Sequence, residues 1–103
     1  MSDIRVIVQY TAQSGKAEPA LMAIAALVQA VLSTEPDCGG IQILQNQAEP
    51  ERITLIERWP NRDIFLGPHM QQPHIRAFIE CAGELLAGPP DISFHAVTEG
   101  ESA

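Results

Sequence analysis

The order of strand-like and helix-like segments constrains this chain more than any single motif. Four segments have the β-branched, aromatic or alternating apolar pattern of strands: residues 4–11, 41–47, 52–59 and 92–97. Two segments with helical spacing separate them, one after the first strand and one before the last. The order strand-helix-strand-strand-helix-strand predicts an α+β chain with the ferredoxin-like βαββαβ arrangement.

Both predicted helices have a proline near their start. Pro19 fits the first turn of the first helix, where its missing N–H costs nothing, and this helix is expected to end near Leu32. It carries so few polar residues that we expect much of its circumference to be buried. Pro73 begins the second helix, which Gly88 and the prolines after it are predicted to end. The apolar stripe of this second helix consists of Ile75, Phe78, Ile79, Ala82, Leu85 and Leu86.

Shorter segments between these elements contain turn residues. Residues 48–51 are expected to join the second and third strands as a four-residue hairpin connection. A short helical turn is predicted around residues 63–66, where Gly67 and Pro68 stop it.

Length and composition fit one folded domain. The chain has 103 residues, and 46% of them are hydrophobic, which is enough to bury a core. We expect a single domain over residues 1–103, with its core at about 4–98 and a polar tail at 99–103.

The net charge of -7 argues against partners that need a basic surface. Nucleic acids and anionic membranes attract Lys and Arg patches, and this chain has 6 Lys plus Arg against 13 Asp plus Glu. Asp3 and Arg5 stand where a secretory signal has its apolar region. The most apolar stretch, residues 20–32, is shorter than the roughly 20 residues of a membrane span. We therefore expect a cytoplasmic protein whose partners are small molecules or proteins.

Cysteine and histidine spacing does not predict a metal site. Cys38 and Cys81 are far apart and form no C-x-x-C motif. His69 and His74 are five residues apart with Pro73 between them, unlike the i,i+4 pair of a helical zinc site.

Apolar residues on both sides of the predicted strands point to a second subunit. The alternation places one residue set of each strand toward the helices. Two helices cover only one face of a sheet, and the other face carries Ile7, Leu44, Ile56 and Val97. We expect these residues to be covered by another copy of the chain, giving a homodimer.

With this element order in place, several short motifs resemble one family. They are residues 35–39, the Glu57-Arg58-Trp59 end of the third strand, His69, and residues 73–78 at the start of the last helix. Their order and spacing resemble the antibiotic biosynthesis monooxygenase family, which includes quinol monooxygenases. The resemblance covers nearly the whole chain, from Ile4 to Val97.

The resemblance implies a fold and an activity. The fold is a dimeric α+β barrel, in which each subunit has a pocket between its sheet and helices and the other sheet face forms the dimer. The activity in oxygenase members is oxidation of phenolic or quinol compounds without flavin or metal.

Two other activities occur in proteins of similar sequence. Haem-degrading members use an asparagine near the end of the first strand and a histidine in the last helix. This chain has Val8-Gln9-Tyr10 and Phe78 at those places, which disfavours haem. Members that rearrange a small signalling metabolite resemble residues 69–74 and 86–89 well, so isomerisation stays open.

Two residues are candidate catalytic groups. His69 follows the Gly67-Pro68 break and has an ordinary pKa of roughly 6.5, suited to a general base, although a solvated surface histidine fits the pattern too. Glu57 shares a strand face with Leu55 and Trp59, so it needs a cationic partner or a raised pKa. An ion pair that closes the barrel is the alternative for Glu57.

Candidate substrate-binding residues surround them: Trp59, Tyr10, Leu55, Phe65 and His74. For the tryptophan, plain core packing is the alternative. These side chains fit a cofactor-independent monooxygenase acting on a small phenolic or quinol-type aromatic. The alternatives are an isomerase, which a basic cluster near the pocket would favour, and a non-catalytic dimeric module that binds a small molecule.

Overall fold

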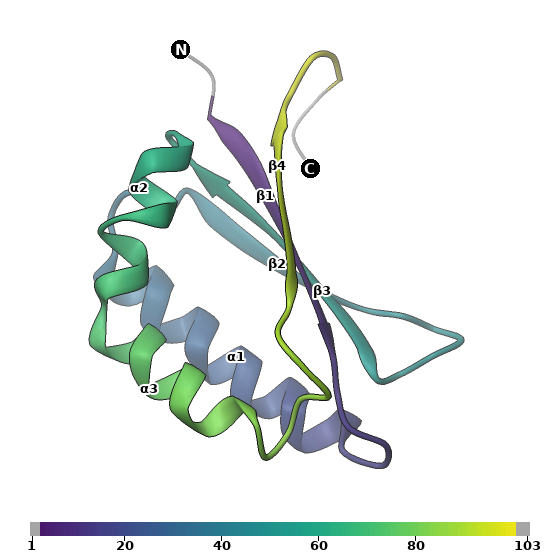
Figure 1. Cartoon of the computed structure of the whole chain (residues 1–103). Helices are drawn as coiled ribbons and strands as arrows, with labels where there is room; N and C mark the ends of the chain where they lie inside the picture. Colours follow the sequence, from purple (N-terminus) through teal and green to yellow (C-terminus); the bar gives the residue numbers. More distant parts are fainter. Residues whose placement is uncertain (1–2, 101–103) are drawn as a thin grey trace.

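Helices cover one face of a four-stranded antiparallel sheet in the computed structural model, which describes residues 3–100 (Figure 1). The elements are β1 (Ile4–Thr11), α1 (Ala17–Thr34), β2 (Gly40–Gln45), β3 (Arg52–Trp59), α2 (Arg62–Leu66), the 3₁₀ helix η1 (His69–Gln71), α3 (Pro73–Ala82) and β4 (Asp91–Ala96). The strand order is β2-β3-β1-β4. The predicted α+β, ferredoxin-like βαββαβ fold is confirmed. Of the tail predicted at residues 99–103, the last three residues lie outside the described part of the chain.

Strand register defines the two faces of the sheet. On β3 and β1, Glu57 lies opposite Val6 and Leu55 lies opposite Val8. These inward residues are buried under the helices, whereas Ile7 and its partner Ile56 point to the other face. The predicted division of each strand into two faces is confirmed. The core is completed from the helical layer, mainly by α1 and Phe65.

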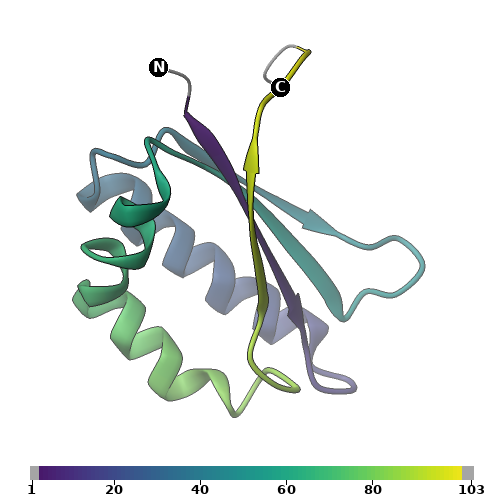
Figure 2. The same ribbon diagram turned by 45° about the horizontal axis from the view of Figure 1, so that its top comes forward.

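One face of α1 packs on the sheet (Figure 2). Its buried residues are Ala20, Ile24, Val28 and Val31. The expectation that much of the circumference is buried is wrong for the single chain, because Met22 is 68% exposed and Leu32 43%. Helix α1 is long and apolar enough to cross a membrane by length and composition, a criterion that the core helix of a globular domain also meets.

The β2–β3 hairpin is confirmed with a longer connection than predicted. Strand β2 ends at Gln45, so residues 46–51 form the loop instead of residues 48–51. The side chain of Asn46 accepts hydrogen bonds from the N–H groups of Ala48 and Glu49, which draws the chain out of the strand.

The helical segment after β3 follows the predicted breaks. Asn61 caps α2 by accepting a hydrogen bond from the N–H of Ile64, and Gly67 ends that helix. The 3₁₀ helix η1 then leads directly into α3, which begins at Pro73 as predicted.

Helix α3 ends earlier than predicted, at Ala82 rather than beside Gly88. Residues 83–87 are instead tied to the end of β1. The side chain of Gln13 donates to the carbonyls of Gly83 and Leu86, and the N–H of Ala87 donates to the carbonyl of Thr11. These long-range bonds replace the ones that a continued helix would make. Helix α3 therefore packs on α1 and η1 and stands away from the sheet.

Candidate functional site

A cavity of about 570 Å³ lies between the helical layer and the inner face of the sheet. Most of its wall is aliphatic or aromatic. The lining includes Val8, Tyr10, Leu27, Val28, Val31, Ile41, Leu55, Glu57, Phe65, His69, Met70, Ile75, Phe78, Ile79, Ala82, Leu86, Pro89, Pro90 and Ile92. A concave, mostly apolar pocket with a few converging polar groups is typical of a small-molecule site.

Three titratable side chains reach this cavity: Tyr10 from β1, Glu57 from β3 and His69 from η1. All three were predicted as site residues, and the fold brings them together from distant parts of the chain. No lysine or arginine of residues 3–100 lines the cavity. The basic cluster that would favour a phosphorylated substrate is therefore not found there.

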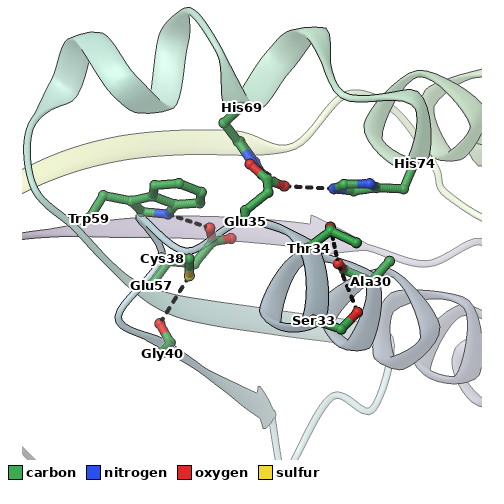
Figure 3. Close-up of polar contacts among 10 residues, drawn as sticks. All are labelled: Ala30, Ser33, Thr34, Glu35, Cys38, Gly40, Glu57, Trp59, His69 and His74. Carbon is green, nitrogen blue, oxygen red and sulfur yellow. Dashed lines mark hydrogen bonds and ion pairs between the residues drawn. The ribbon is translucent and has the colours of Figure 1, made fainter.

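Glu57 is a buried carboxyl group held by Trp59. The indole Nε1–H of Trp59 donates to Oε1 of Glu57 across 2.8 Å (Figure 3). Burial raises the pKa of Glu57 to about 7, and the charge of Glu35 adds to this, while the bond from Trp59 acts in the opposite direction. Glu57 therefore exchanges a proton near neutral pH, as a general acid or base must.

His69 is held by a carboxylate that it shares with His74. Its Nδ1–H donates to Glu35, whose Oε1 lies 2.9 Å away, and His74 donates from Nε2 to Oε2 across 2.6 Å (Figure 3). No buried side-chain nitrogen or oxygen of the described residues lacks a hydrogen-bond partner. The second ring nitrogen of His69, Nε2, has no hydrogen-bond partner among residues 3–100, so it is open to the cavity that His69 lines.

Burial lowers the pKa of His69, and the hydrogen bond and charge of Glu35 partly offset this shift. When His74 is protonated, its positive charge lowers the pKa of His69 further. His69 is therefore neutral at pH 7, with its proton on Nδ1 and a free lone pair on Nε2.

Glu35 is the site residue that the sequence analysis did not identify. It follows the last turn of α1 and is buried, although most glutamates are exposed. The sequence analysis includes it only within the turn 35–39 that carries the family resemblance. Its partners lie 34 and 39 residues away, beyond any local spacing rule. An acidic residue directly after an apolar helix was the available signal.

Trp59 and His74 lie behind the cavity wall. Trp59 is completely buried, and its ring packs 4.5 Å from His69 and 5.7 Å from Phe65, measured between centroids. His74 is partly buried and contacts Glu35. Neither side chain lines the cavity, so the two predicted substrate-binding residues support groups that do.

Tyr10, Leu55 and Phe65 line the cavity as predicted. The Tyr10 ring lies edge-on to Phe78 at 5.9 Å. Burial, with the nearby charge of Glu57, raises the pKa of Tyr10 far above its usual range, so its hydroxyl stays protonated and can donate a hydrogen bond. Leu55 and Phe65 supply apolar wall.

Cys38 and Cys81 are both free thiols. Burial raises the pKa of Cys38 to about 11, which makes it a poor nucleophile. Within residues 3–100, no three His, Cys, Asp or Glu side chains are grouped to hold a metal ion.

The raised pKa of Glu57 predicts a pH-dependent stability. A carboxyl group that binds its proton more tightly when folded makes the free energy of unfolding fall as pH rises between about 4.5 and about 7. Glu57→Gln cannot ionise, so it removes this pH-dependent loss of stability. Its amide oxygen can still accept the hydrogen bond from Trp59. Between pH 5 and pH 8, we expect the free energy of unfolding of the variant to rise by up to about 3 kcal/mol relative to that of the parent protein. Urea unfolding at both pH values measures it.

The matched control for this measurement is Glu80→Gln, an exposed position on α3. It should show the same pH trend as the parent protein. An equal trend in Glu57→Gln would show that Glu57 is already ionised at pH 5 in the folded chain.

Several known proteins are similar to this chain in sequence or in structure. A curated relative, protein sll1783 of Synechocystis, is 29% identical over 69 residues, which are 67% of this chain and 46% of that protein. The chain thus spans about half the length of that relative. The structure of PA3566 from Pseudomonas aeruginosa has a TM-score of 0.82 at 23% identity, over 95% of this chain and 97% of that one.

Two further solved structures are similar. One from Bordetella bronchiseptica has a TM-score of 0.84 at 19% identity, covering 96% of this chain and 100% of the other. Rv0793 from Mycobacterium tuberculosis has a TM-score of 0.78 at 24% identity, covering 98% and 100%. These likenesses establish the fold. The model of the family described as antibiotic biosynthesis monooxygenase matches residues 3–80, and the chain therefore belongs to this family.

Proposed function

We propose that the protein is a monooxygenase that oxidises a phenolic or quinol-type compound with dioxygen and needs no cofactor. One observation carries this proposal: a neutral imidazole nitrogen, a carboxyl group with a pKa of about 7 and a protonated phenol face the same apolar cavity. These groups supply a base and two hydrogen-bond donors in mostly apolar surroundings.

His69 is the proposed base. Its Nε2 accepts the proton of the substrate hydroxyl, while Glu35 holds the Nδ1–H and stabilises the imidazolium that forms. The substrate then becomes an electron-rich anion next to apolar wall, where dioxygen dissolves readily.

Glu57 and Tyr10 are the proposed donors to that anion. In its protonated form Glu57 donates from the oxygen that Trp59 does not occupy, and Tyr10 donates from its hydroxyl. Ionised Glu57 repels the substrate anion instead. The rate should therefore rise with pH through the pKa of His69 and fall through the pKa of Glu57, near 7.

The oxidation balances with dioxygen as the only oxidant. A quinol loses two electrons to become a quinone and two more as one ring C–H becomes C–OH. Dioxygen accepts these four electrons. One of its oxygen atoms enters the ring, and the other leaves as water with two of the hydrogens that the substrate loses.

The cavity fits the alternatives less well. An isomerase of a phosphorylated metabolite needs cations for the phosphate, and no lysine or arginine of the described residues lines the cavity. A binding module without chemistry needs no shared carboxylate that fixes one tautomer of a cavity histidine.

The first prediction tests the base. His69→Gln should lower the oxidation rate by about 10²- to 10⁴-fold, because the amide cannot accept and release the proton. His74→Gln should lower it much less, because His74 does not line the cavity. Oxygen uptake with a panel of quinols, corrected for spontaneous oxidation, measures both. Equal rates for His69→Gln and the parent would rule out His69 as the base.

A second prediction concerns Glu35. Its carboxylate raises the pKa of His69, so Glu35→Gln should lower that pKa. The acidic side of the pH–rate profile should move to lower pH, and the maximal rate should fall because the base is weaker. A role in folding alone would lower the rate without moving the profile. Asp37→Asn, an exposed position in the same turn, is the control.

A third prediction concerns the subunits. We propose that two copies pair through the outer face of the sheet. This face carries Ile7 and Ile56, which are neighbours on β1 and β3 of the same chain, and Leu44, which is 46% exposed. Ile56→Lys should give a folded monomer, because the charge is costly to bury in an apolar contact. Ala26→Lys, exposed on α1, should stay dimeric. Sedimentation and circular dichroism measure the outcome; a monomeric parent protein would contradict the pairing.

A further inference from the structure

The cavity is much larger than one aromatic ring requires. A dry protein cavity of about 150 Å³ is enough to bind benzene. This cavity has about 570 Å³. A single-ring phenol would fill only part of this volume and would leave apolar wall in contact with water, which is unfavourable.

Glu57 and His69 lie toward one end of this space, and Tyr10 lies between the two ends. Glu57 lies opposite Val6 on β1, and the cavity continues along β1 past Val8 and Tyr10 to Leu86, which bridges to Ala12. Val6 and Ala12, the β1 partners of Glu57 and Leu86, are six positions apart, or about 20 Å at 3.3 Å per position. The distance exceeds the width of one ring, so the substrate that fills the cavity is elongated.

The far end of the cavity is apolar. It is lined by Phe78, Ile79, Ala82, Leu86 and Pro89, whereas Ile92 of β4 pairs with Val8 and lies partway along the cavity. Ile79 is 56% exposed and Ile92 40%, whereas Leu55 beside the catalytic groups is 1% exposed. The opening therefore lies between α3 and β4, and its rim is hydrophobic.

The rim is held in place by the β1–α1 turn. Gln13 binds the carbonyls of Gly83 and Leu86, and the ammonium group of Lys16 donates to the carbonyl of Glu84 across 2.9 Å. The segment after α3 is therefore fixed by bonds to backbone atoms, so the opening is a preformed part of the cavity.

We infer that the substrate is a phenol or quinol with an extended aliphatic substituent, which lies beneath α3 and extends past Phe78 and Ile79 toward Leu86. The identity of the head group rests on the proposed function, because that function places a phenol or quinol at Glu57, Tyr10 and His69. The assignment of an aliphatic substituent depends on the length of the cavity and on the apolar lining of its far end. A polar or charged substituent has no partner among the side chains that line this end.

The test is binding of 4-alkylphenols with one, four and eight carbons in the chain, measured by titration calorimetry without oxygen. Simple phenols are not quinols, so binding is measured apart from oxidation. Affinity should rise about two- to fourfold for each added methylene until the chain reaches the opening. Equal affinities across the series would overturn the inference. A rigid polycyclic phenol that binds more tightly than 4-octylphenol would overturn it too.

Variants and a ligand control identify where the chain lies. Ile79→Asp should weaken binding of 4-octylphenol at least tenfold and leave 4-methylphenol unchanged. Ala77→Asp puts the same charge on an exposed position of α3 outside the cavity and should change neither. Equal effects of the two variants would contradict the placement. The methyl ether of 4-octylphenol, which has no hydroxyl proton, should bind more weakly.

This experiment separates the inference from the proposed function. Tight, chain-dependent binding sensitive to Ile79→Asp supports the inference even if long-chain quinols cause no oxygen uptake, a result that would reject the monooxygenase. Oxygen uptake that is as fast with unsubstituted quinols as with long-chain quinols would support the monooxygenase function. The same result would reject the inference that the substrate carries an aliphatic substituent.

Discussion

The carboxylate of Glu35 is the interaction on which the site depends. It lies just beyond the end of α1 and accepts hydrogen bonds from His69 at the start of η1 and from His74 in the first turn of α3. One side chain thus joins the end of α1 to η1 and α3, whose histidines lie 34 and 39 residues later in the sequence. Without it, nothing in the described hydrogen bonds would fix the orientation of the His69 ring.

A second buried acid gives the site its other proton. Glu57 is buried, and the negative charge of Glu35 adds to the effect of burial in raising its pKa. Glu35 has two histidines as partners, whereas Glu57 has one indole N–H. Burial of Glu57, with only this one donor, accounts for its pKa of about 7. Of the two acids, Glu57 lines the cavity, and Glu35 holds His69 from behind it.

The sequence predicted the fold because its signals are local. Alternating residues on the strands identified the inner face, including Leu55, Glu57 and Trp59 on β3. Local signals failed where distant bonds decide the structure. Leu85 and Leu86 continue the spacing of α3, yet Gln13 binds this segment to β1 instead. Glu35 was missed for the same reason, because its partners are distant. Trp59 was placed on the correct face, but the pattern could not tell cavity wall from the layer behind it.

The way α3 is attached has a consequence for the evolution of the family. Of its side chains only Ile75 is buried, and the helix stands away from the sheet, tied near its start through Glu35 and beyond its end through Gln13. Substitution of an exposed cavity-lining residue of α3 such as Ile79 therefore alters the cavity at little cost to the core that α1 and the sheet form. A chain built in this way can acquire new substrate preferences by mutation without first acquiring spare stability.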